Sequence, residues 1–194
     1  MHSHARTLFT AVAFSLLAAP AIAQQPTSSQ QPAGLMGELV KDVTDVQGKL
    51  IALARELPSP ALEWRPGDGV RSTGEVLLHI AADNYLLPIG VGVPAPASTG
   101  ISIGDFSTLT TFETQRLSRE AMIASLDTSF AHLVAAMSAT TPARLDETIT
   151  FFGQEMTVLQ LWVLTTGHLH EHLGQLIAYT RTNGIAPPWS RPAQ

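Results

Sequence analysis

The stretch VLQLWVLTTGHLHEHLGQLIAYTRTN, residues 158–183, has the apolar spacing of one long α-helix. Thr157 before it is a suitable N-cap residue, and Gly184 after it, followed by two prolines, ends the helix. Polar side chains on an inward helix face are unfavourable unless they are paired or bound to a ligand. One face of this helix changes from apolar to polar, through Leu161, Thr165, His168, His172, Gln175 and Tyr179. The stretch therefore predicts a helical bundle with a polar site in its interior.

Three other segments have helical periodicity. Residues 35–57 carry apolar side chains at steps of three or four. Residues 73–87 follow Ser72 and include Glu75, which together form a Ser-x-x-Glu capping box. A further apolar helix is predicted over residues 119–138. With the histidine-bearing helix, these segments predict an all-α fold, a four-helix bundle.

The connections between these helices differ in character. Residues 89–109 are rich in Gly, Pro and Ser and predict a long connection that crosses over the bundle or covers it as a lid. Residues 148–157 are rich in β-branched and aromatic side chains around Phe152-Gly153, which predicts a short β-hairpin before the last helix. No βαβ alternation and no Gly-rich phosphate loop occur. We therefore expect one bundle domain over residues 35–190.

The N-terminus has the pattern of an export signal. Arg6 precedes an apolar run that is followed by Ala21-Ile22-Ala23, a small-x-small cleavage pattern. Residues 1–23 are therefore predicted to be a signal peptide, and the polar residues 24–34 a disordered tether. We expect a periplasmic or secreted protein with no stable membrane span after cleavage, because we expect no later segment to be long and apolar enough to cross a bilayer.

The composition excludes several classes of protein. The formal net charge is −5, and only 11 of the 194 residues are Lys or Arg, so we expect no binding to nucleic acid. The chain has no cysteine, which removes thiolates as nucleophiles and as metal ligands. No Gly-x-Ser-x-Gly and no His-Glu-x-x-His motif is present.

The histidines of the last helix form a pattern suited to a metal ion. His168 and His172 are four residues apart and therefore share one helix face, whereas His170 points to nearly the opposite side. Two ligands hold a divalent ion poorly, so a third is expected from another helix. His79, in the middle of an apolar helix, is the best candidate. The alternative is a core histidine at position 79 and a bundle without metal.

Two carboxylates lie one helical turn from His79. Asp83 and Glu75 are each candidates for a catalytic base, for an orienting partner of an imidazole, or for a fourth ligand. Glu75 has a second explanation, because it is also the capping-box residue. His132 lies among apolar neighbours in another helix, which favours ordinary packing.

The segments RSTGEVLLHIAADNYLLP and HLHEHLGQLIAYTRTNGIAPP resemble the DinB-like (DinB/YfiT) family of metal-binding four-helix bundles. The positions that match the metal ligands of this family are His79, His168 and His172, and Leu173-Gly174-Gln175 follows as in the family pattern. Trp64-Arg65-Pro66 matches its entry to the second helix. The resemblance implies an up-down-down-up or related left-handed bundle with a three-histidine site that keeps one position open to water and binds Zn or Ni.

Two departures from the family bear on activity. Family members with known activity include transferases and isomerases that use low-molecular-weight thiols in the cytoplasm, whereas this chain carries a predicted export signal. Leu173 stands where many relatives carry Arg. Both departures weaken the resemblance to the thiol transferases.

Three functions remain open at the level of sequence. The first is a metal-dependent enzyme, a hydrolase or thiol-type transferase, that acts on a small-molecule substrate. The second is a non-catalytic metal- or ligand-binding protein of the cell envelope. The third is a bundle without metal, and a homodimer through an exposed helix face is compatible with all three.

Overall fold

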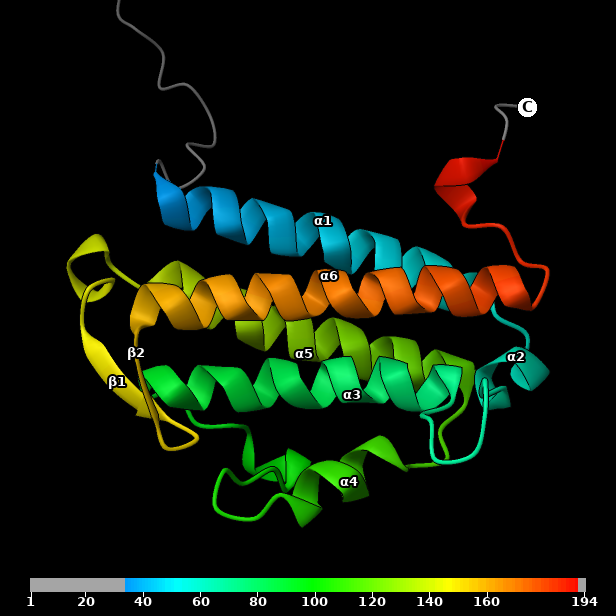
Figure 1. The fold of residues 1–194 in the computed structure, drawn as a ribbon, viewed down its shortest axis with the longest axis horizontal. Coiled ribbons are helices and arrows are strands. Elements are labelled where there is room, and N and C mark those ends of the chain that lie inside the picture. The colour runs from blue at the N-terminus through cyan, green and yellow to red at the C-terminus, as the bar shows by residue number, and fades with distance from the viewer. Residues whose placement is uncertain (1–33, 192–194) are drawn as a thin grey trace, which may run out of the picture. The chain divides into compact units, whose positions relative to one another are not determined.

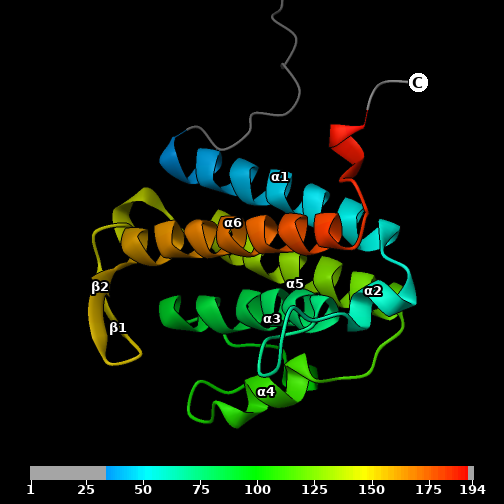
Figure 2. The same ribbon diagram turned by 45° about the vertical axis from the view of Figure 1, so that its right-hand side comes forward.

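The computed structural model describes residues 34–191, so the predicted signal peptide and residues 24–33 of the predicted tether lie outside the described residues. Four long helices form the bundle: α1 (Leu35–Glu56), α3 (Thr73–Leu86), α5 (Arg119–Ala139) and α6 (Val158–Thr182). Helix α6 lies between α1 and α3, and α5 packs against both of them on the other side (Figures 1 and 2). The predicted all-α four-helix bundle is confirmed.

The helix directions explain the long connection in the middle of the chain. Helices α1 and α6 run one way and α3 and α5 run the other way, which is the up-down-down-up order (Figure 1). Because α3 and α5 are parallel, the chain must return along the length of α3 before α5 can begin. The returning segment contains α4 (Ser107–Glu113), which packs against α3.

The helix α4 was not predicted. Its sequence STLTTFE contains three threonines, which have low helix propensity because their β-branched side chains are restricted in a helix. The other short elements are α2 (Ser59–Glu63) and four 3₁₀ helices. These are η1 (Leu87–Val91), η2 (Ala97–Thr99), η3 (Pro142–Arg144) and η4 (Pro188–Ser190).

The predicted hairpin is present. Strands β1 (Thr148–Phe151) and β2 (Gln154–Thr157) pair antiparallel, with Phe151 opposite Gln154. The two turn residues, Phe152 and Gly153, have φ values of 51° and 72°. A turn with two positive φ values matches the twist of a two-residue hairpin. Strand β2 follows this turn and ends at Thr157, which is the N-cap residue of α6.

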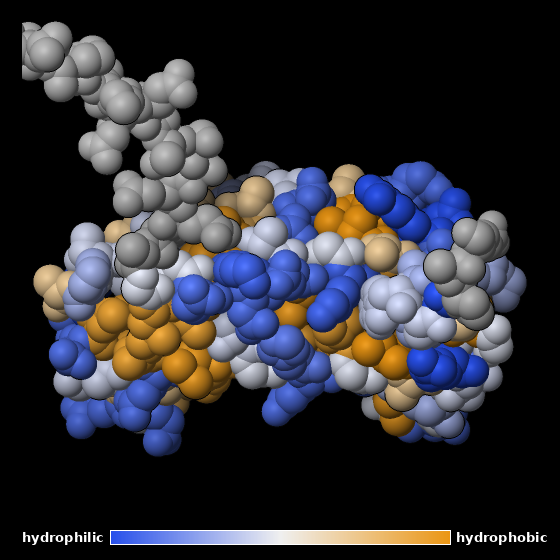
Figure 3. All heavy atoms as spheres, turned by 90° about the horizontal axis from the view of Figure 1, so that it is seen from above, coloured by the Kyte–Doolittle hydropathy of each residue, from blue (hydrophilic) through white to orange (hydrophobic). Residues whose placement is uncertain are grey.

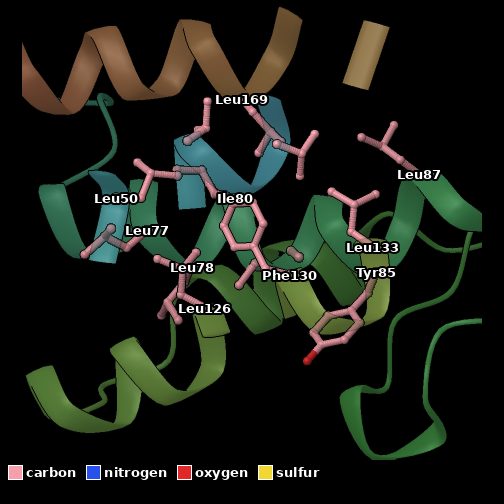
Figure 4. Close-up of a cluster of buried hydrophobic side chains, with 14 of the residues drawn as sticks. Leu50, Leu77, Leu78, Ile80, Tyr85, Leu87, Leu126, Phe130, Leu133 and Leu169 are labelled. Carbon is pink, nitrogen blue, oxygen red and sulfur yellow. The ribbon is translucent and has the colours of Figure 1, made fainter. Parts of the chain in front are cut away.

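The apolar core lies between the four long helices (Figure 4). Its largest fully buried side chain is Trp162 of α6, whose indole N–H donates a hydrogen bond to the Thr140 hydroxyl, so that burial leaves no unpaired donor. Helix α3 is buried on nearly all sides. It can therefore place a polar side chain in the interior only if that side chain has partners.

Helix α5 is long and apolar enough to cross a membrane by length and composition, so the expectation that no later segment reaches this threshold was wrong. Its buried residues Leu126, Phe130 and Leu133 are at most 1% exposed. They pack against the neighbouring bundle helices, which is the environment of a core helix.

One end of the molecule carries apolar surface. Seen from above, polar side chains alternate with apolar ones, and an apolar area gathers at the end where α6 begins (Figure 3). Val163 and Leu164 of this helix are 52% and 47% exposed. Apolar surface of this kind is common at subunit interfaces, but the predicted homodimer stays a prediction.

Candidate metal centre

The three predicted histidines meet in the interior between α3 and α6. One ring nitrogen from each of His79, His168 and His172 lies within 4.8 Å of the other two. The ring centroids of His168 and His172 are 4.4 Å apart, and that of His79 is 5.3 Å and 4.7 Å from them. The i, i+4 spacing on α6 and a mid-helix position on α3 are thus sufficient to form one cluster.

His79 is oriented by a carboxylate that comes from α4. Its Nδ1 lies 2.7 Å from Oε1 of Glu113, and Glu113 in turn accepts a 2.8 Å hydrogen bond from Nε of Arg71. The carboxylate can accept only if Nδ1 carries the proton, and in the neutral imidazole this leaves Nε2 of His79 with a free lone pair. Sequence analysis missed Glu113 and Arg71, because neither lies near a histidine along the chain and α4 itself was not predicted.

His172 is oriented from within its own helix. Its Nδ1 lies 2.8 Å from Oε1 of Gln175, whose amide donates a 2.9 Å hydrogen bond to the Tyr179 hydroxyl. The Tyr179 ring meets the edge of Trp64, with ring centroids 5.2 Å apart. The Gln175 and Tyr179 positions on the polar face of the helix therefore hold the imidazole with its Nε2 toward the cluster.

Burial keeps His172 neutral. The pKa of His172 is lowered to about 4, chiefly by loss of solvent and also by positive charge on His168 and His79, while the hydrogen bond to Gln175 and the charge of Asp83 act in the opposite direction. A neutral imidazole is the form that binds a metal ion. The site therefore presents a metal-binding form of this ligand at neutral pH.

Glu113 is ionised because its hydrogen bonds stabilise the charged form of the carboxylate. Burial raises the pKa of Glu113, but the hydrogen bonds from His79 and Arg71 outweigh burial, so that its pKa lies below the usual value for a glutamate. Its side chain is only 10% exposed. The site thus contains a buried negative charge that is compensated by the Arg71 guanidinium and stabilised by the hydrogen bond from His79.

Asp83 lies beside two of the three histidines. Its Oδ2 is 2.8 Å from Nε2 of His168 and 3.4 Å from Nε2 of His79. The short distance to His168 does not have the angles of a hydrogen bond, and Nε2 of His168 is buried without a hydrogen-bond partner in the described part of the chain. We therefore do not count the contact between Asp83 and His168 as a hydrogen bond, because hydrogen bonds weaken steeply when they are misaligned.

The remaining candidates lie elsewhere. Glu75 accepts hydrogen bonds from the Ser72 backbone N–H and from Arg65, so both of its oxygens serve the start of α3. His170 points away from the cluster and contacts Asp42 of α1 at 2.9 Å. His132 packs beside Tyr85, with ring centroids 5.4 Å apart, and is not part of the cluster.

The donor set fits a divalent metal ion. Nδ1 of both His79 and His172 is engaged with an acceptor, so that the Nε2 atoms remain for the ion, and Nε2 of His168 is buried and has no hydrogen-bond partner among residues 34–191. Three imidazoles leave at least one coordination position open, as in catalytic zinc sites, and the same donors also suit nickel. The identity of the metal stays a prediction.

A separate cavity lies at the end of the bundle where α3 and α5 begin. It has a volume of about 290 Å³ and is lined by residues of α2, of the two helix starts and of the 114–118 connection. None of the three histidines lines this cavity. The metal centre is therefore a compact polar cluster between helices and not the wall of this cavity.

The fold and the cluster together define a helical-bundle protein of the three-histidine metal-binding class. Residues 43–176 match the model of the DinB superfamily, and the chain belongs to this family. A comparison with curated protein sequences found no match.

Three solved structures have the same fold. A DinB-like protein of Bacillus cereus has a TM-score of 0.64 at 18% identity, over 79% of this chain and 95% of that chain. The DinB-like protein YjoA of Bacillus subtilis has a TM-score of 0.59 at 20% identity, over 80% of this chain and 96% of that chain.

The third structure is YfiT from Bacillus subtilis, which is described as a probable metal-dependent hydrolase with an unusual four-helix bundle topology. Its TM-score is 0.61 at 14% identity, over 84% of this chain and 94% of that chain. At such identities the three likenesses show the fold alone.

Proposed function

We propose that this protein is an exported metal-dependent hydrolase that acts on a small-molecule substrate. The single observation that carries the proposal is the cluster of His79, His168 and His172, whose ligand nitrogens lie within 4.8 Å of one another with a carboxylate beside two of them. The description of YfiT supports hydrolysis over thiol transfer, and so does the predicted export to a compartment where small thiols are scarce.

The three imidazoles would hold the metal ion, Zn or Ni, which when bound lowers the pKa of a bound water and polarises the substrate. We assign Asp83 as the proton acceptor. Its side chain is 12% exposed, and its Oδ2 lies within 3.4 Å of both His79 and His168, so it is next to the position a reacting water must take. We assign Glu75 to the cap of α3 and give it no chemical role.

A second candidate is non-catalytic metal binding in the cell envelope. One observation favours it: the cavity of about 290 Å³ is not lined by any of the three histidines. Catalytic turnover therefore distinguishes the two candidates, since both require the metal.

The test compares two histidine variants from the same helix. We expect one divalent metal per chain in the wild type and in His170→Ala, because His170 faces Asp42 of α1. We expect His168→Ala to lose most of the metal and of any hydrolytic activity in a panel of ester, amide and phosphoester substrates. Metal is measured by elemental analysis of protein purified without added metal.

A variant of the proposed base adds a second criterion. Asp83→Asn is expected to keep the metal and to lose at least about 100-fold in turnover, as for removal of a general base. Metal retention without turnover on any substrate of the panel in the wild type would favour the non-catalytic candidate. Equal metal content in wild type and His168→Ala would contradict both.

A further inference from the structure

We propose that Glu113, anchored by Arg71, is the positioning residue of this metal centre and sets its affinity for the metal. The inference rests on the proposed metal site and deepens it. It concerns residues outside the three-histidine pattern, on a segment that the sequence presents as an ordinary connection.

Glu113 lies where it can orient the His79 ring. Glu113 is the last residue of α4, which packs along α3, and its Oε1 lies 2.7 Å from Nδ1 of His79. A neutral imidazole that donates from Nδ1 presents a bare Nε2 on its opposite side. Glu113 therefore fixes both the tautomer and the ring orientation of the one ligand that α6 does not supply.

The charge of the Glu113 carboxylate is paired with Arg71. Glu113 is buried, with a side chain 10% exposed, and a buried carboxylate is costly unless it is paired. Arg71 pairs with both oxygens, at 2.8 Å to Oε2 and 3.3 Å to Oε1. The Arg71 side chain is 44% exposed, so the guanidinium lies on the solvent side of the buried carboxylate. A carboxylate hydrogen-bonded to a ligand imidazole makes that imidazole more basic and strengthens its bond to a metal ion.

The Nδ1 partner of His172 differs in charge from that of His79. The corresponding Nδ1 contact of His172 is to the neutral amide oxygen of Gln175. Charged hydrogen bonds are roughly twice as strong as neutral ones. The charge of Glu113 would thus act on a bound metal ion through His79, whereas His172 has a neutral partner at its Nδ1.

The first measurement is metal affinity by chelator competition. Glu113→Gln keeps the size of the side chain and an acceptor oxygen but removes the charge, and we expect a loss of about 10- to 100-fold in affinity with one site per chain retained. Glu120→Gln is the matched control, because Glu120 is paired with Arg119 but is 71% exposed on α5. Its affinity should equal that of the wild type. Equal affinities of wild type and Glu113→Gln would overturn the inference.

The second measurement is independent of the metal and of turnover. Nitrogen–proton correlation spectra of metal-free protein at pH 8 show which ring nitrogen of His79 carries the proton. We expect Nδ1–H in the wild type and a shift toward Nε2–H, the form favoured by free histidine, in Glu113→Ala. A wild-type His79 protonated at Nε2 alone would also overturn the inference.

The two measurements separate this inference from the proposed function. If the wild type binds metal without hydrolysing any substrate, the affinity difference still tests the role of Glu113. If the wild type binds no metal, the proposed function fails, while the tautomer of His79 still reports whether Glu113 positions it.

Discussion

Two histidines of this chain illustrate how surroundings decide the role of a residue. His79 has Glu113 on one ring nitrogen and the cluster on the other, and its side chain is 12% exposed. His170 lies only two positions from two cluster histidines, yet its side chain is 48% exposed and contacts Asp42 on the surface. Helix geometry separates His170 from the cluster histidines of α6. Adjacent positions point about 100° apart, so residues two positions apart face nearly opposite sides.

Gly90 shows steric control at a single residue. A Cβ at this position would lie 2.8 Å from side-chain atoms of both Leu161 and Phe151. We expect Gly90→Ala to lower the free energy of unfolding by about 1–3 kcal/mol through overpacking. Gly48→Ala is the control, because a methyl group at Gly48 of α1 would have no neighbour within 4 Å, and it should raise stability by up to about 1 kcal/mol. Urea denaturation of the metal-free proteins measures both, and equal effects of the two variants would contradict the packing.

At the scale of elements, both helices that supply the cluster histidines begin with a capping box. Ser72 and Glu75 cap α3, and Thr157 and Gln160 cap α6. Each box satisfies two backbone N–H groups that the first turn leaves free. These local contacts fix where each helix starts and therefore how far along it each histidine lies.

The capping glutamate makes the stability of α3 dependent on pH. Burial raises the pKa of Glu75, but hydrogen bonds from Ser72 and Arg65 outweigh burial, so its pKa in the folded protein is lower than usual. Its contribution is therefore present above the unfolded pKa of about 4.3 and lost as pH falls through the lower folded value. We expect Glu75→Gln to be about 0.3–1 kcal/mol less stable at pH 7, with a smaller difference at pH 3.

The control for this experiment is Glu155→Gln. Glu155 is exposed on β2, so its replacement should change stability by less than about 0.5 kcal/mol at either pH. Chemical denaturation at pH 7 and pH 3 gives the values. A deficit for Glu75→Gln that grows toward pH 3 would show that ionised Glu75 does not stabilise the folded protein.

At the scale of the whole molecule, the candidate metal centre joins α3 and α6 and, through Glu113, also α4. A ligand that binds only the folded state stabilises it by about 2.7 kcal/mol at a concentration of 100 times Kd. For a chain of 194 residues this corresponds to a rise in Tm of about 5–10 °C. We expect this rise when Zn²⁺ is added to wild-type protein stripped with a chelator.

The histidine variants supply the comparison for the thermal measurement. His170→Ala should show the same rise in Tm as the wild type, and His172→Ala should show little or none. Differential scanning calorimetry measures each with and without metal. A rise of equal size in His172→Ala would place the stabilising ion at another site.

The sequence by itself determined the elements whose signals are local. Periodicity placed the four long helices, and the observed bounds of α1 and α6 differ from the predicted ones by a single residue at the C-terminal end. The spacing of His168 and His172 made a shared face inevitable, since four residues complete about one turn. The mid-helix position of His79 made it the third candidate, and the cluster has formed there.

Only the tertiary structure decided the partners that complete the site. Glu113 lies 34 residues from His79 along the chain and reaches it only because the connection between two parallel helices must run back along α3. The choice between Asp83 and Glu75 was equally inaccessible, since both lie one turn from His79 and differ only in what packs against them. Periodicity records contacts within a few residues of the chain, whereas the path of a crossover and the neighbours of a carboxylate are set by packing of the whole bundle.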